Sequence, residues 1–173
     1  MLSPIVKGKG NWIVLKENTY TPIKQGIVII KNSPSSSEKK EIFYNFLFSK
    51  KVKGILNAIG NYVYNNLKSN KVLLSPPQGA FYLMPEFKNK KYKNSSKMCE
   101  AILKDTGVAM LPGSDFGFKP KKMLTRLSYT DFDGTEFFNN VKDYNSVDDD
   151  MIKKYAPNIV EGVSKLSNWA KNL

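Results

Sequence analysis

The apolar runs between residues 72 and 117 of this chain are short, and a proline or a glycine lies within or beside each of them. The stretch 72–84 holds two such runs around a Pro-Pro pair and Gly79, and the stretch 108–117 (VAMLPGSDFG) holds a third that stops at a Pro-Gly pair. Proline cannot donate a ladder hydrogen bond, so it marks strand ends and edges. We therefore expect short strands joined by tight turns. The third run fits a buried strand entering a turn, and it also fits a loop whose backbone approaches a ligand.

A fourth strand is predicted in the segment 121–130 (KKMLTRLSYT), because its residue types alternate with period two. This alternation places Arg126 on the polar face of the strand. Four residues form one set and three the other: Met123, Thr125, Leu127 and Tyr129 against Leu124, Arg126 and Ser128.

Helical spacing of apolar residues predicts two helices in the same half of the chain. The first begins near Ser95 or Ser96, which we expect to cap it, and ends at Gly107. The second covers about 156–173, and the more polar segment 143–155 before it is predicted to be a loop. The apolar faces are Met98, Cys99, Ile102 and Leu103 in the first helix, and Ile159, Val163, Leu166 and Ala170 in the second.

The first 57 residues carry a separate pattern, a short strand-strand-helix unit. Strands are predicted at 12–15 and 27–30, where β-branched residues gather. A helix capped by Ser35, Ser36 or Ser37 follows, with Ile42, Phe43, Phe46 and Leu47 as its apolar stripe. A second helical stripe then comprises Val52, Ile55, Leu56, Ile59, Val63 and Leu67, and is interrupted by Gly54 and Gly60.

Composition excludes several classes of site. The 173 residues include no histidine and one cysteine, Cys99, so the usual zinc sites, histidine bases and internal disulfides cannot form, and we expect no metal site. We expect Cys99 to be an inert, buried thiol. No apolar run is long enough to cross a membrane, and the N-terminus lacks a signal-peptide pattern, so we expect a cytoplasmic protein.

The net charge of +12 raises the question of nucleic-acid binding. Of the 27 basic residues, only Arg126 is an arginine, and the lysines are scattered among asparagines. Phosphate recognition usually relies on arginine and on clustered charge. We therefore expect a lysine-rich solvated surface and no nucleic-acid partner.

The N-terminal pattern has a counterpart in a known family. The segment 20–63, which includes YTPIKQG and the helix FYNFLFS, resembles the C-terminal segment of molybdate-type periplasmic substrate-binding proteins. In those proteins this segment follows the oxyanion-binding positions, so the resemblance implies no binding residue here. It implies a binding-protein fragment at residues 1–57.

Several motifs in the remainder of the chain occur in the order found in another family. PPQGAFYLMPEF, SSKMCEAILKDTGVAMLPGSDFG and LTRLSYTDFDG together resemble the C-terminal small domain of class I/II aminotransferases, enzymes that depend on pyridoxal phosphate. The resemblance covers residues 58–173. It implies an α/β (α+β) fold, a small mixed sheet with covering helices.

The resemblance also implies a role for Arg126, which matches the arginine that holds the substrate α-carboxylate in this family. A planar guanidinium donates two parallel hydrogen bonds to a carboxylate, whereas an ammonium does not. The alternative to substrate binding is that Arg126 is an exposed strand residue whose side chain forms an ion pair with Asp131 or Asp133. By the same resemblance the 113–117 turn lies near the substrate entrance. We expect Phe116 to serve packing, and Phe81 and Tyr82 to be core strand residues.

Other parts of the family's site have no counterpart in this sequence. We find no serine-rich motif with an aldimine-forming lysine, and we assign no catalytic or cofactor-binding residue. The leading hypothesis is therefore a truncated, inactive aminotransferase-like protein without its own cofactor. One alternative is the small-domain half of a split aminotransferase, completed by a partner chain or acting as a homodimer on an amino-acid or 2-oxo-acid carboxylate. Another is a remnant of an oxyanion-binding protein.

Overall fold

The computed structural model describes residues 36–47 and 49–173, and the chain divides into two units, residues 1–49 and 50–173. The described part of the first unit is the helix α1 (Ser37–Leu47). The hydroxyl of Ser36 accepts a hydrogen bond from the Lys39 N–H at 3.3 Å, so the predicted serine cap is confirmed. The predicted strands at 12–15 and 27–30 lie outside the described residues.

The apolar stripe predicted for α1 is exposed in the structure: Ile42, Phe43 and Phe46 are all solvent-accessible. The helix is therefore present where the periodicity predicts it, without the burial that the periodicity suggests.

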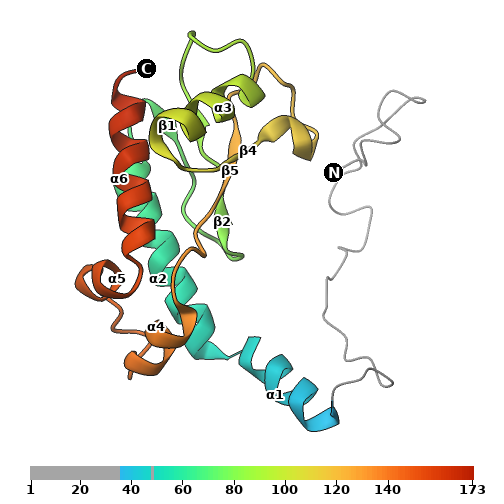
Figure 1. Cartoon of the computed structure of the whole chain (residues 1–173), viewed down its shortest axis with the longest axis vertical. Helices are drawn as coiled ribbons and strands as arrows, with labels where there is room; N and C mark the ends of the chain where they lie inside the picture. The colour runs from blue at the N-terminus through green and yellow to red at the C-terminus, as the bar shows by residue number, and fades with distance from the viewer. Residues whose placement is uncertain (1–35, 48) are drawn as a thin grey trace, which may run out of the picture. The chain divides into compact units, whose positions relative to one another are not determined.

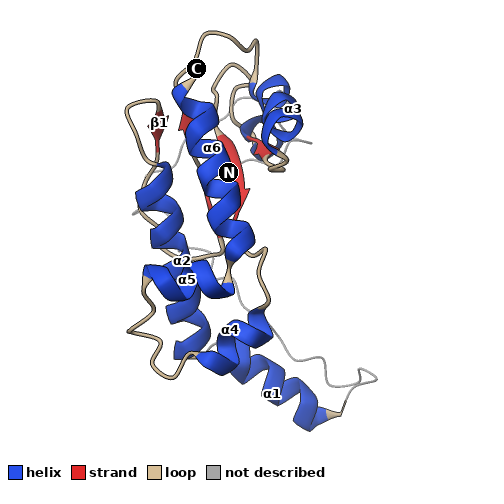
Figure 2. Cartoon of the chain, turned by 60° about the vertical axis from the view of Figure 1, so that its left-hand side comes forward, coloured by secondary structure: helices blue, strands red, loops and turns tan. Residues whose placement is uncertain are grey.

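The second unit combines helices with short strands, which confirms the predicted fold class. Its helices are α2 (Lys50–Leu67), α3 (Ser95–Thr106), α4 (Gly134–Asn140), α5 (Asp149–Tyr155) and α6 (Pro157–Lys171). Its strands are β1 (Val72–Leu73), β2 (Tyr82–Leu83), β3 (Glu86–Phe87), β4 (Leu111–Pro112) and β5 (Thr125–Ser128), and a 3-10 turn spans Gly113–Phe116. Helix α2 packs against α6, and the two run side by side in both views (Figures 1 and 2).

Helix α2 is one unbroken helix, although two glycines interrupt its apolar stripe. The structure explains both glycines by close packing. A Cβ on Gly60 would lie 2.9 Å from the Tyr129 hydroxyl, and a Cβ on Gly54 would lie 2.8 Å from Tyr144. The predicted junction of the two sequence patterns, at residues 57–58, falls inside this helix.

The strands form two small antiparallel sheets, one with β1 beside β3 and one in the order β2-β5-β4. In the larger sheet Tyr82 pairs with Ser128, and Leu111 pairs with Arg126. The strand predicted at 108–111 is shorter than expected and begins at Leu111. One reason is that the Val108 N–H bonds to the Thr106 hydroxyl at 3.1 Å, directly after the end of α3.

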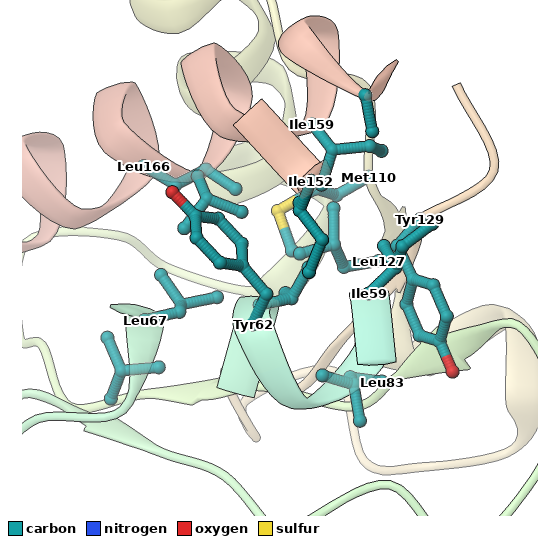
Figure 3. Close-up of a cluster of buried hydrophobic side chains, with 14 of the residues drawn as sticks. Ile59, Tyr62, Leu67, Leu83, Met110, Leu127, Tyr129, Ile152, Ile159 and Leu166 are labelled. Carbon is teal, nitrogen blue, oxygen red and sulfur yellow. The ribbon is translucent and has the colours of Figure 1, made fainter. Parts of the chain in front are cut away.

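The hydrophobic core lies between α2, α6 and the inner face of the β2-β5-β4 sheet (Figure 3). The predicted apolar face of α6 is buried, and that of α2 is buried except for Val52 and Leu56, which are partly buried. In β5, Thr125, Leu127 and the following Tyr129 point inward, as the alternation predicts. The labelled core residues are Ile59, Tyr62, Leu67, Leu83, Met110, Leu127, Tyr129, Ile152, Ile159 and Leu166.

Two local predictions are wrong. The segment 143–155 is not all loop, because α5 begins after Asp148, whose carboxylate accepts the Met151 N–H at 2.9 Å. The cap of α3 is Asn94 rather than a serine, and its side chain accepts the Lys97 N–H at 2.9 Å. In both cases a polar side chain one residue outside the helix satisfies the first N–H groups.

Helix α3 otherwise follows its prediction at both its buried face and its end. Met98, Cys99 and Ile102 are buried, although Leu103 is exposed. Gly107 adopts φ 76° and ends the helix in the left-handed conformation that favours glycine. No helix in the described part of the chain is long and apolar enough to span a membrane.

Candidate functional site

Arg126 lies in the middle strand of the larger sheet, on the face opposite the core. Its neighbours in sequence, Thr125 and Leu127, are buried, whereas Arg126 is half-buried and Ser128 is exposed. Residues two apart in a strand share a face, and cross-strand partners do as well. The outer face therefore carries Arg126 together with Ser128, its partner Tyr82, and Leu111.

Two aromatic rings flank the Arg126 guanidinium. Its central carbon, Cζ, lies 4.2 Å from the centre of the Tyr82 ring and 5.3 Å from the centre of the Phe116 ring. A cation over an aromatic face is attracted by the negative charge of that face. A guanidinium carries five N–H donors, and the hydrogen bonds among the described residues include none from the Arg126 side chain to a carboxylate.

Arg126 does not form an ion pair with Asp131 or Asp133, which is the alternative that the sequence leaves open. Asp131 instead accepts a hydrogen bond from the Asn158 amide at 3.4 Å, and Asp133 caps α4 through the N–H groups of Thr135 and Glu136. Among the residues that the structure describes, the Arg126 side chain has aromatic neighbours and no carboxylate partner.

The turn at 113–117 sets Phe116 over Arg126. The Gly113 N–H donates to the Leu124 carbonyl at 2.7 Å, and a Cβ on Gly113 would lie 2.8 Å from that oxygen. Gly117 closes the turn with φ 84°, a conformation that side chains rarely adopt. The two glycines thus serve close packing and backbone conformation, as the sequence suggests, and bring the turn down onto β5.

The aromatic neighbours of Arg126 are the part of the site that the sequence interpretation misses. Tyr82 was expected in the core, but it lies half-buried on the outer face, and Phe81 is 45% exposed. Phe116 packs as expected, although its partner is the arginine. The sequence signal for Tyr82 is its place in a strand: the buried Leu83 next to it requires Tyr82 to face outward.

Cys99 lies under the turn, buried on α3 as predicted. Burial, and secondarily the negative charge of Asp115, raises the pKa of its thiol from 9.0 to about 11. A shift of this size leaves about 100-fold less thiolate at a given pH below 9. Since the folded-state pKa is raised, this group favours the folded state below pH 9 and that contribution is lost as the pH rises from 9 toward 11.

We expect Cys99 to react with DTNB at pH 8 at least ~100-fold more slowly in the folded chain than in the urea-unfolded chain, because thiolate is the reacting form. Stopped-flow absorbance with and without urea measures both rates. Comparable rates in the two states would contradict the burial of the thiol.

A separate cleft of about 480 Å³ opens where β4 and β5 diverge. Val108 and Ala109 line one side, residues 128–131 the other, and α6 closes it. Its polar side chains satisfy one another, since Asp131 accepts from Asn158 and Glu161 forms an ion pair with Lys165 at 2.6 Å. Arg126 does not line this cleft, so the cleft and the Arg126 site are separate places.

The known proteins that this chain is similar to are aminotransferases. An aspartate aminotransferase from Sulfolobus acidocaldarius is 25% identical to this chain over 169 residues, which cover 94% of this chain and 36% of that protein. The chain thus spans about a third of the length of this relative. The match supports an aminotransferase-like fold and gives no support to a molybdate-type segment at residues 1–57.

Two solved structures are similar to the chain over part of its length, and no family model matches it. The aspartate aminotransferase from Thermotoga maritima has 21% identity and a TM-score of 0.44, covering 68% of this chain and 23% of that one. The alanine aminotransferase from Pyrococcus furiosus has 16% identity and a TM-score of 0.49, covering 81% and 28% respectively.

Proposed function

We propose that this chain is the small-domain part of an aminotransferase-like protein and that Arg126 binds the carboxylate of an amino acid or a 2-oxo acid. The observation that carries this proposal is the Arg126 guanidinium, held against two rings with no carboxylate partner among the described residues. The ordered sequence motifs and the aspartate aminotransferase match support the same class.

The described residues around Arg126 do not fit pyridoxal phosphate, the cofactor of the family that the chain resembles. Tyr82 and Phe116 contact the guanidinium, and neither side chain has the amine that forms an imine with the cofactor aldehyde. We therefore assign no step of transamination to these residues. Our proposal is that the chain alone has no transaminase activity and that its contribution is to bind and orient a carboxylate.

The binding proposal has a direct test because Arg126 is the only arginine. A ¹⁵N NMR spectrum of the full chain should contain one arginine Nε–Hε resonance, and this resonance should shift saturably as a carboxylate is added. We expect the variant Arg126→Lys to bind at least ~10-fold more weakly, since an ammonium lacks the two parallel donors. Calorimetry or a ligand-observed titration measures the affinity of the variant.

A matched control separates a site from a general effect of positive charge. Lys142 is exposed and lies between α4 and α5, so Lys142→Gln removes one charge elsewhere. Arg126→Gln should abolish the saturable binding, whereas Lys142→Gln should leave it unchanged. Equal weakening in both variants would mean that the net charge, rather than Arg126, attracts the anion.

A second candidate, the small-domain half of a split enzyme, is favoured by exposed apolar side chains in the second unit. Leu73, Phe81, Leu103 and Leu111 are each about half exposed, as expected of a surface that packs on another domain. A neighbouring gene that encodes an aminotransferase large domain with its aldimine-forming lysine would support this candidate. Absence of such a gene would leave the carboxylate-binding proposal as it stands.

A further inference from the structure

The outer face of the larger sheet combines one unpaired cation with apolar and aromatic side chains. Beside Arg126 lie the rings of Tyr82 and Phe116, and its cross-strand partner Leu111 is 50% exposed. Phe81 extends this apolar surface, since its ring meets the Tyr82 ring edge to face with centres 5.9 Å apart. A ligand whose carboxylate meets Arg126 therefore has carbon surface next to it.

No lysine among the described residues stacks on the two rings that flank Arg126. The nearby turn contains Lys122, but its ammonium lies 3.5 Å from the Glu86 carboxylate and over the Phe118 ring. A second carboxylate that lay against these rings would lose part of its hydration to aromatic carbon.

We infer that the ligand of the Arg126 site is a monocarboxylate with an apolar or aromatic body, that is, an amino acid or 2-oxo acid with an uncharged, hydrophobic side chain. This inference rests on the proposed function and adds the class of ligand. The guanidinium binds the carboxylate, and the rings and Leu111 provide apolar surface against which the body of the ligand packs. The site distinguishes such ligands from dicarboxylates and from small polar acids because it pairs one positive charge with apolar surface.

Four probes separate these contributions in titrations of the full chain, followed at the single arginine Nε–Hε resonance and by calorimetry. The probes are 3-phenylpropanoate, with carboxylate and body; acetate, with the carboxylate alone; succinate, with a second carboxylate; and 3-phenylpropan-1-ol, with the body alone. We expect 3-phenylpropanoate to bind at least ~10-fold more tightly than the other three, because only it satisfies both parts of the face.

Two variants identify the residues that carry the preference. Leu111 is exposed, so Leu111→Thr should fold normally; it should weaken 3-phenylpropanoate several-fold and leave acetate unchanged. Tyr82→Thr removes the ring that positions Arg126 and should weaken every carboxylate by ~2- to 5-fold, as expected for a cation–π contact. Tyr82→Phe keeps the ring face and should restore the affinity.

The outcomes distinguish this inference from the proposed function. If succinate binds as tightly as 3-phenylpropanoate, or if Leu111→Thr weakens acetate equally, the ligand class is wrong while carboxylate binding at Arg126 stands. If no carboxylate shifts the Arg126 resonance, both proposals fail. A ligand preference that persists in Arg126→Gln would also overturn the inference, because the preference would then arise elsewhere.

Discussion

Replacing Tyr129 by alanine should lower the free energy of unfolding by about 3–5 kcal/mol, the range for removing a large buried aromatic side chain. Tyr129 is 1% exposed, and its ring fills the space beneath Gly60 of α2. Its hydroxyl donates to the Ala80 carbonyl at 3.0 Å. The side chain thus joins α2 to β5 and to the turn before β2, and its loss leaves a cavity among all three.

The conservative variant Tyr129→Phe separates packing from hydrogen bonding. It keeps the ring and removes the hydroxyl, so we expect a loss of only about 1 kcal/mol. Burial raises the pKa of the Tyr129 phenol, so in the native chain stability should fall as the pH rises above 10, and this dependence should shrink in Tyr129→Phe. Urea unfolding followed by circular dichroism measures all three proteins. A loss below 1 kcal/mol for Tyr129→Ala would show that the ring is not part of the core.

Replacing Gly113 by alanine should destabilise the chain by about 1–3 kcal/mol, the usual cost of forcing extra atoms into a packed region. The added Cβ would lie 2.8 Å from the Leu124 carbonyl oxygen and 3.1 Å from the Leu124 Cβ. Because the first of these atoms belongs to the backbone of the residue directly before β5, the turn itself must move. Phe116 should then shift away from Arg126.

The Gly113 prediction has two readouts and a matched control. Unfolding by urea gives the stability, and the Arg126 Nε–Hε resonance should move because the ring current of Phe116 changes. In Gly134→Ala the new Cβ would meet its nearest atom, on Phe132, at 4.0 Å, so we expect a change within about 0.5 kcal/mol. A Gly113→Ala protein with native stability and an unmoved resonance would refute the close packing of the turn.

The long periodic segments show how much of this fold the sequence predicts. The stripe of α6 and most of the stripe of α2 are buried as their spacing predicts, because the two helices pack on each other. The alternation in β5 likewise places Arg126 outward and Tyr129 inward. Where many residues repeat one pattern, the pattern and the tertiary packing agree.

Short elements and helix ends were predicted less well, for physical reasons that the sequence pattern does not reveal. Helix α5 has only two buried residues, so it has no apolar stripe that periodicity could detect. The sequence signal for this helix is the acidic first turn together with the lysines of the last turn. In a segment as polar as this one, these charged residues are also typical of a loop. The strand at 108–111 is shortened by a hydrogen bond from Val108 to Thr106, which competes with sheet pairing. Such contacts depend on the position of one side chain.

The candidate site likewise contains one residue that the sequence predicts and two neighbours that it does not. The sequence identifies Arg126 through its rarity and its motif, but it does not predict the rings that flank it. Tyr82 and Phe116 are 34 residues apart, and they meet at Arg126 only because β2 pairs with β5 and the turn folds over that strand. A contact of this kind follows from sheet register and from a glycine turn, neither of which has a periodic signal.

The size of the larger sheet also bears on how the chain behaves at high concentration. Both of its edge strands are two residues long; β4 contains Pro112, and Pro85 follows β2 closely. An edge strand with free N–H and C=O groups is a template for pairing with another chain, and short strands with proline remove that template. This sheet therefore resists edge-to-edge aggregation, even though apolar residues such as Phe81 and Leu111 are exposed close by.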